Sequence, residues 1–431
     1  MKSWLQTNID NSGLILFRIL LGVLILFESF GAILFGWVQS VFVTSKFTFN
    51  FIGFDFLQVL HGEKMYLYFS IMGFLGLLII LGLFYRFAII MFTILWTSVY
   101  LAQKEYYNNH YYFLVLVGLI MCFLPANAKV SLDSKIAPHI KAYTVPRWMP
   151  FLLILQMAIL YFYATIAKLY PDWLDGTFAK ILLNGITQRD ELLHLFNHQW
   201  FYLFYAYAGI LYDLLIVPFL FWKRTRIFGI IASFAFHLSN AFALKIGIFP
   251  FLALSFIVLF IDPEKINKLL FKSNLSSSLS QNPRVNLYKW FFIPFFIIQI
   301  ILPIRHYFIK GDVLFTEEGH RLAWRMMLRE RVGALKIKIV NKNRGNTFYH
   351  NMLKDLNAKQ LKVVSYSPDL IWQYCQKLKQ EYPFPVEIYV ESFVSVNRRP
   401  FNRMIDEKVN MAVAKFDYFF HNDWILLQDL E

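Results

Sequence analysis

The chain has 431 residues, of which 58% are hydrophobic, 19% aromatic and 16% charged. About a quarter of the residues in a soluble domain are charged, so this composition excludes an ordinary soluble enzyme and indicates a polytopic membrane protein. The net charge of +14 lies mostly in short loops between apolar runs. Membrane topology explains such loops better than nucleic-acid binding does. Cys122 and Cys375 are too few for a disulfide framework.

Apolar runs that approach the length of a membrane crossing fill the first part of the chain. The predicted spans are 14–36, 65–84, 87–102, 112–125, 151–169, 200–222, 227–241, 246–261 and 290–303. Lysine and arginine are concentrated in alternate loops. By the positive-inside rule, the N-terminus is then cytoplasmic and the tail after Pro303 is extracytoplasmic. We therefore predict an all-α membrane bundle of about nine transmembrane helices over residues 1–305.

The composition changes after about Gly311. Residues 335–340 and 386–396 alternate between apolar and polar with period two, as half-buried strands do. Between them, residues 368–380 have helical spacing after a Ser-Pro start. We predict a small C-terminal α+β extramembrane domain over residues 306–431.

A few polar residues lie near the predicted extracytoplasmic ends of the spans. They are Asn108, Asn109, His110, Lys168, His237, Asn240 and His306. A lysine in this position either snorkels to the interface or sits uncharged among apolar side chains with a chemical task. The two intramembrane histidines also have ordinary interpretations, as interfacial or helix-bonding side chains. Asp213, inside the sixth span, is either structural or part of a proton route.

No metal site is expected from the sequence. His194 and His198 are spaced for one face of a helix, but neither a His-Glu-x-x-His motif nor an obvious third ligand accompanies them. Glycine-rich phosphate loops, nucleophile elbows and Cys-x-x-Cys pairs are absent from the sequence. The candidate chemistry therefore rests on the polar residues at the ends of the spans.

Short sequence blocks occur in a consistent order from about Leu14 to Leu426. They are Phe17-Arg-Ile-Leu-Leu-Gly22, Met65-Tyr-Leu-Tyr68, Leu81-Gly-Leu-Phe-Tyr-Arg86, Asn108-Asn-His-Tyr-Tyr112, Lys168-Leu-Tyr-Pro-Asp-Trp173, Phe236-His237 with Asn240 and Gly247-Ile-Phe249, Leu302-Pro303 to His306, and Trp324-Arg-Met-Met327. With these blocks the chain resembles the vitamin K-dependent γ-glutamyl carboxylase family over nearly its whole length.

The resemblance implies a membrane enzyme that oxidises a reduced vitamin K-type naphthoquinone with O2 to the epoxide. It further implies that this oxidation drives γ-carboxylation of protein glutamate with CO2. Lys168 aligns with the family's catalytic lysine. An uncharged amine suits the removal of a phenolic proton whose pKa is about 10. Ala167 stands where animal enzymes have a second lysine, so Lys168 is the only candidate base here.

The other site residues also follow from the resemblance. His110 with Asn109 is expected to orient the oxygenated quinone or to support carboxylation, and His237 is expected to be a second supporting group. Three side chains are expected to line the quinone pocket, and two lie in the segment that engages glutamate in animal enzymes. The pocket residues are Phe249, Met326 and Met327, and the substrate residues are Trp324 and His320.

The sequence also departs from the animal pattern. Arg325 replaces an acid, and the animal cysteine of the first outside loop has no counterpart. Two alternatives therefore stay open beside the carboxylase: a quinol epoxidase without carboxylation, and a non-catalytic membrane scaffold of the same fold. The expected partners are a glutamate-containing protein or peptide and membrane lipid, without nucleic acid. The expected location is a bacterial inner membrane rather than the endoplasmic reticulum.

Overall fold

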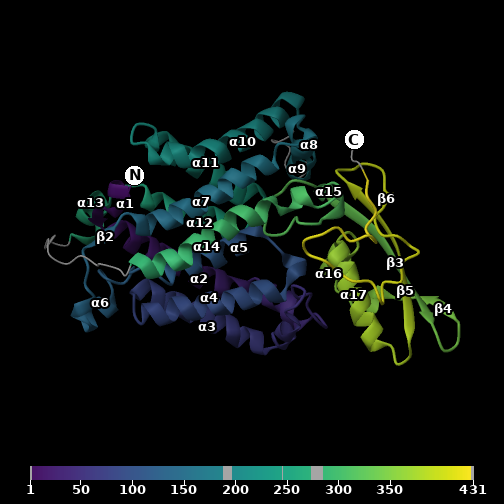
Figure 1. Cartoon of the computed structure of the whole chain (residues 1–431). Coiled ribbons are helices and arrows are strands. Elements are labelled where there is room, and N and C mark those ends of the chain that lie inside the picture. The colour runs from purple at the N-terminus through teal and green to yellow at the C-terminus, as the bar shows by residue number, and fades with distance from the viewer. Residues whose placement is uncertain (1, 188–196, 245, 273–284, 429–431) are drawn as a thin grey trace.

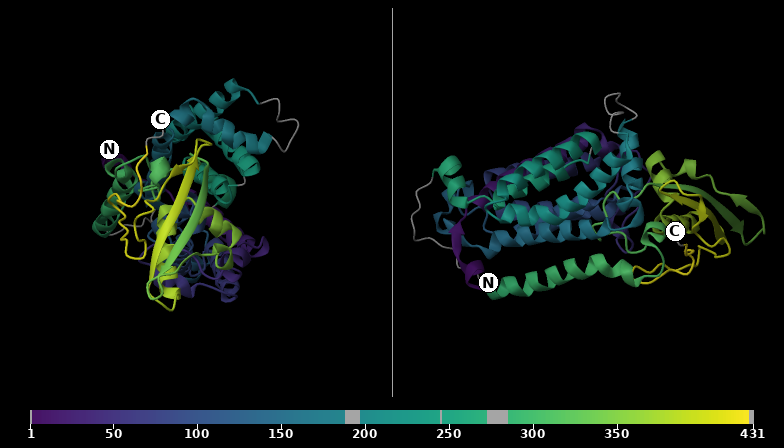
Figure 2. Two further views of the ribbon diagram at one scale, coloured as in Figure 1. Left: turned by 90° about the vertical axis from the view of Figure 1, so that its right-hand side faces the viewer. Right: turned by 90° about the horizontal axis from the view of Figure 1, so that it is seen from above.

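The protein consists of a long helical bundle with a smaller sheet region stacked on one end (Figure 1). The computed structural model describes residues 2–187, 197–244, 246–272 and 285–428. The first helix, α1 (Lys2–Gln6), lies at the far end of the bundle, and the C-terminal strands lie beyond its other end, the sheet end. Figure 2 shows from two further directions that the long helices run roughly along the axis joining these ends.

Six helices in the described part of the chain are long and apolar enough to cross a membrane. They are α2 (Ser12–Leu34), α3 (Lys64–Leu81), α4 (Tyr85–Ala102), α7 (Trp148–Ala167), α10 (Gln199–Phe221) and α14 (Val285–Ile304). Shorter apolar helices are α5 (Asn109–Met121), α11 (Arg226–Leu244) and α12 (Phe249–Ser255). Every predicted span coincides with one of these helices, so the prediction of a helical integral membrane protein is confirmed, while the count of nine crossings stays a prediction.

The eighth predicted span, 246–261, is broken rather than continuous. Its α-helix, α12, ends at Ser255, and a 3-10 turn, Phe256–Leu259, continues it. Pro250 stands in the first turn of α12, where the ring fits because that position has no helical hydrogen bond to donate. A helix of this length is too short to cross a bilayer, and most of its residues are buried among the neighbouring helices.

Helices α2 and α3 pack closely because glycines face one another at their crossing. A Cβ atom on Gly22 would lie 2.9 Å from the carbonyl oxygen of Gly76, and one on Gly76 would lie 2.8 Å from the backbone nitrogen of Leu26. Contacts between small residues allow membrane helices to approach without an intervening side chain. This part of the resemblance block 17–22 therefore has a packing role.

Short elements join the helices at both ends of the bundle. At the far end, β1 (Asn8–Asp10) pairs with β2 (Thr144–Pro146), which the sequence analysis did not predict. The short helices are α6 (Leu132–Ile136), α8 (Pro171–Leu174), α9 (Thr177–Thr187), α13 (Pro263–Ile266) and α15 (Val313–Thr316). Of these, α8, α9 and α15 lie toward the sheet end (Figure 1).

The sheet region is built on a four-stranded antiparallel sheet in the order β4–β3–β5–β6. Its strands are β3 (Arg331–Asn341), β4 (Thr347–Tyr349), β5 (Val386–Val396) and β6 (Asn402–Arg403), and its helices are α16 (Ala358–Val364) and α17 (Pro368–Glu381). Alternate residues of β5 such as Ile388 and Val390 are buried with Ile371 and Tyr374 of α17. The predicted α+β region is thus confirmed, while the division at residues 305/306 stays a prediction.

The sheet region rests on loops at the sheet end of the bundle. The ammonium of Lys104, which follows α4, lies 2.7 Å from a carboxylate oxygen of Asp369 at the start of α17. The side-chain amide of Gln360 in α16 donates to the carbonyl oxygen of Phe47 in the loop after α2, at 2.7 Å. These buried contacts fix the sheet region over the ends of the membrane helices.

Candidate active site

A cavity of about 80 Å³ lies at the sheet end of the bundle, and we call it the Lys168 cavity. Its walls come from α5, α7, α10, α11, α12 and the segment that precedes β3. Six of the predicted site residues line it: Lys168, His110, His237, Phe249, Met326 and Met327. Asp213, Asn240 and Tyr161 line it as well. The structure therefore brings together polar side chains that are far apart in the sequence.

Lys168 lies directly after the last turn of α7, and Pro171 begins α8 three residues later. The side chain does not snorkel to the surface, because the residue is only 8% exposed. Its ammonium forms an ion pair with Asp213 of α10, donates to the carbonyl oxygen of Ala164 at 3.3 Å, and lies 5.5 Å from the ring of Trp173. Of the two interpretations, the buried one fits the structure better, but it did not include the carboxylate that lies against the amine.

His110 lies in the first turn of α5, where the sequence favours a helix start. The side chain of Asn108 caps this helix by accepting a hydrogen bond from the backbone nitrogen of Tyr111 at 2.7 Å. The imidazole of His110 stacks on the ring of Phe249, with 4.2 Å between centroids and 16° between planes. Both rings of this stack line the Lys168 cavity.

Asn109 does not line the Lys168 cavity. Its side-chain amide donates to the backbone carbonyl of Arg325 at 3.2 Å and accepts from the hydroxyl of Tyr107 at 2.8 Å. Asn109 therefore holds the segment that carries Met326 and Met327 against the start of α5. Its assignment to the chemistry stays a prediction.

His237 is buried in α11 between two phenols that the sequence analysis did not single out. The hydroxyl groups of Tyr161 in α7 and Tyr212 in α10 lie 2.9 and 3.0 Å from its Nε2 atom. Its Nδ1 atom is buried and has no hydrogen-bond partner within the described residues. A phenol inside an apolar span is a weak signal in the sequence, because its partner becomes evident only when the helices are paired.

The segment 317–327 reaches the Lys168 cavity at Met326 and Met327 and has a strained conformation. Glu317, Leu322, Trp324 and Met327 all have positive φ angles, between 49° and 62°. Such residues cost on the order of 1 kcal/mol each and persist where the surroundings enforce them, often at functional sites. The segment therefore holds the backbone of Met326 and Met327 at the cavity in a defined conformation, while their side chains stay free to change rotamer.

Trp324 and His320 do not line the Lys168 cavity. Trp324 is fully buried, and its ring stacks on Tyr112 at 5.0 Å. His320 is also buried, 6.2 Å from the ring of Tyr107. Burial, together with nearby arginines of which Arg329 is the strongest, holds the pKa of His320 well below its usual value. The assignment of both residues to substrate binding stays a prediction.

The expected gathering of polar residues is divided between two places. Asn240 lines the Lys168 cavity, whereas His306 faces a separate cavity beside it. Within the described ranges no group of three or more histidine, cysteine or acidic side chains is arranged to hold a metal ion. His194 lies outside the described residues, and His198 is an exposed residue just before α10.

Comparison with protein families places this architecture in a known class. The model of the HTTM domain matches residues 6–264, more than half of the chain, and defines the bundle as an HTTM-type membrane protein. A second model, the vitamin K-dependent gamma-carboxylase lumenal domain, matches residues 284–431. The chain belongs to the vitamin K-dependent gamma-carboxylase family. No solved structure matches it.

Proposed function

We propose that this protein oxidises a reduced vitamin K-type naphthoquinone with O2 in the Lys168 cavity and thereby carboxylates glutamate side chains with CO2. The observation that carries this proposal is the meeting of a buried lysine–carboxylate pair, two buried histidines and flat apolar walls in one cavity. The bound quinol supplies the oxygen chemistry: quinol, O2, CO2 and glutamate give epoxide, water and γ-carboxyglutamate. We further propose that the N-terminus is cytoplasmic and the sheet region extracytoplasmic, in a bacterial inner membrane.

The residues of the cavity fit a naphthoquinol in kind. Phe249 and the thioethers of Met326 and Met327 suit an aromatic ring, and the unpartnered Nδ1 atom of His237 is a buried polar group that a quinol oxygen would satisfy. Ligand cavities usually exceed about 300 Å³, so the cavity of about 80 Å³ must widen. Met327 is 38% exposed and flexible, so we expect the wall to open there.

Lys168 accepts the phenolic proton of the quinol in this proposal. The amine has to be uncharged when it does so, and the Asp213 carboxylate can accept the proton that the Lys168 ammonium gives up. An ammonium beside a carboxylate and an amine beside a carboxylic acid differ only in the position of one proton, so their interconversion moves no net charge into the bundle. Asp213 thus acts as a positioning residue and proton acceptor for Lys168. His110 and His237 orient the ring and support the later steps.

The test uses the whole protein in a membrane mimic supplied with vitamin K hydroquinone, O2, CO2 and a glutamate peptide. Mass spectrometry measures epoxide and γ-carboxyglutamate from the same preparation. General-base catalysis contributes about 10²–10⁴-fold, so Lys168→Ala is expected to reduce epoxide formation by at least about 10²-fold, with partial recovery on adding methylamine. Lys180→Ala, an exposed lysine of α9 at the same end of the bundle, is the matched control.

The outcomes separate the candidate functions. Unchanged epoxide formation in Lys168→Ala removes Lys168 from the mechanism. Epoxide without carboxylated glutamate from the unmodified protein identifies a quinol epoxidase, and the absence of both products identifies a scaffold.

A further inference from the structure

A second cavity, of about 340 Å³, lies back to back with the Lys168 cavity, and we call it the Arg325 cavity. Neighbouring residues face opposite ways along two segments of the chain. Ala167 lines the Arg325 cavity while Lys168 lines the other, and Arg325 lines it while Met326 lines the other. The two cavities therefore lie on opposite sides of the same two chain segments.

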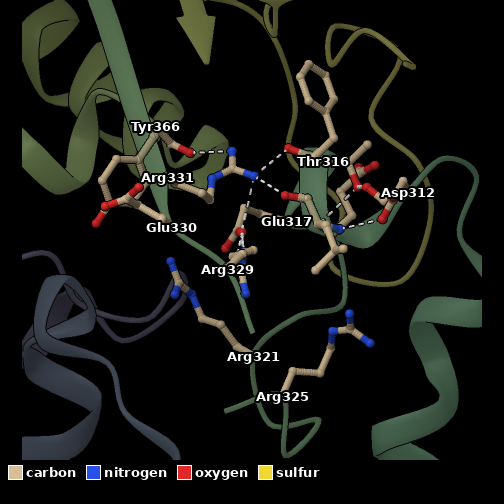
Figure 3. Close-up of polar contacts among 12 residues, drawn as sticks. Asp312, Thr316, Glu317, Arg321, Arg325, Arg329, Glu330, Arg331 and Tyr366 are labelled. Atoms are coloured by element: carbon tan, nitrogen blue, oxygen red, sulfur yellow. Dashed lines mark hydrogen bonds and ion pairs between the residues drawn. The ribbon is translucent and has the colours of Figure 1, made fainter. Parts of the chain in front are cut away.

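Four arginines lie in the strained segment and at the start of β3, and all but one have a carboxylate partner. Arg321 binds Asp369 through two contacts of 3.0 Å. Glu317 pairs with Arg329 and also lies 3.4 Å from Arg331. Arg325 is the exception and has no carboxylate partner within the described residues. Figure 3 shows it apart from the contacts that join Arg329, Arg331 and Glu317.

The guanidinium of Arg325 is buried and nearly without partners. The residue is 7% exposed, and its Nε atom has no hydrogen-bond partner among the residues described. Its Nη1 atom lies 3.4 Å from Nε2 of His306, whose Nδ1 atom donates to the carbonyl oxygen of Pro303 at 2.9 Å. Burial, followed by the charge of Arg329, lowers the pKa of Arg325 to about 10, so the group stays charged at neutral pH. An unpaired buried cation is costly, and an anion would offset this cost.

The other charges at the Arg325 cavity define the kind of anion. Arg399 already neutralises Asp172, with contacts of 2.6 and 2.7 Å. Asp312 accepts a hydrogen bond from the backbone nitrogen of Leu314 at 2.7 Å as the cap of α15. These two carboxylates make the cavity unfavourable for a multiply charged anion. A single planar carboxylate matches the fork of one guanidinium.

We propose that the Arg325 cavity binds the side-chain carboxylate of an acidic residue in the protein substrate, with Arg325 as its binding residue. This inference rests on the proposed carboxylation, because the cavity holds such a carboxylate beside the wall formed by Lys168 and Met326. The volume of about 340 Å³ accommodates an amino-acid side chain.

The experiment compares the binding of two peptides to the unmodified protein and to variants at Arg325, and it requires no catalytic turnover. Fluorescence anisotropy measures the affinity of the whole protein, in micelles without anionic lipid, for a labelled peptide with a single glutamate and for the same peptide with glutamine. A charge-assisted hydrogen bond contributes about 1.5–3 kcal/mol, which corresponds to about a 10- to 150-fold preference for glutamate. In Arg325→Gln we expect this preference to fall below about 2-fold.

A surface arginine provides the matched control. Arg398 pairs with Glu330 on the exposed side of the sheet region, so Arg398→Gln should keep both affinities. Arg325→Lys covers the case in which Arg325→Gln does not fold. It retains the charge without the planar fork, so an intermediate preference is expected.

The proposal is overturned by an unmodified protein that does not prefer glutamate, or by variants at Arg325 that retain the full preference. Competition between the glutamate peptide and phosphatidylglycerol vesicles, lost in Arg325→Gln, would assign the cavity to a lipid phosphate instead. Epoxide formation by the unmodified protein is measured in the same preparation. Failure of the oxidation is thus distinguished from failure of carboxylate binding.

Discussion

Removing Asp213 tests the pairing on which the proposed chemistry depends. Asp213 and Lys168 are 5% and 8% exposed and form an ion pair between α10 and α7. Deleting one partner of a buried pair leaves the other charge uncompensated and costs about 3–5 kcal/mol, whereas deleting both is far less costly. We therefore expect Asp213→Asn and Lys168→Met to destabilise the protein by about 3 kcal/mol each. The double variant should cost about 2–3 kcal/mol less than their sum.

The assay is reversible unfolding in mixed micelles, combined with measurement of epoxide formation by all four proteins. The exposed pair Lys377–Glu381 of α17 is the control cycle, since a surface pair of this kind couples by only about 0.3–0.5 kcal/mol. The variants that lack Lys168 should form at least about 10²-fold less epoxide, even where the double variant regains stability. Additive effects of the two substitutions, within about 0.5 kcal/mol, would refute the reasoning.

Two further predictions concern the fold. Gly76→Ala should destabilise the bundle by about 1–3 kcal/mol in the same unfolding assay, because its Cβ would meet the backbone nitrogen of Leu26 at 2.8 Å. Gly31→Ala is the control and should be neutral or stabilising, because its Cβ would meet only a side chain, at 3.7 Å. Although burial opposes it, Arg321 lowers the pKa of Asp369 from 3.8 to about 2. As the pH falls, Asp369 is therefore protonated in the unfolded chain before it is protonated in the folded protein. Its contribution of about 2 kcal/mol to the free energy of unfolding is complete above about pH 4 and is lost between about pH 4 and 2. Asp369→Asn should remove this acid-sensitive step from the unfolding free energy.

The elements of the fold could be predicted because local pattern determines them. The apolar run 151–169 corresponds to α7, Trp148–Ala167, and the alternating run 386–396 corresponds to β5. Strand β3 extends four residues before the predicted 335–340 because it pairs along the full length of β5. Its first residues carry no clear alternation, so only the partner strand determines where β3 begins.

The residues that line the Lys168 cavity were easier to predict than the contacts between them. Lys168 and His110 were identified from short blocks, and they do share a cavity. The pairing of Lys168 with Asp213 was not predicted, because it depends on α7 lying against α10. The lack of a carboxylate partner for Arg325 could not be predicted either, because the neighbouring arginines in the sequence acquire their partners only on folding.

Trp324 and Met327 both have left-handed backbone conformations, and Arg325 and Met326 lie between them on one short segment. In the two proposals above, this short piece of backbone contacts both ligands. A quinol ring that displaces the backbone at Met326 would also move Arg325, its neighbour in the chain. Binding in one cavity would then change the binding affinity of the other cavity. Thermodynamic linkage requires that each ligand change the affinity for the other by the same factor, although the two ligands make no direct contact.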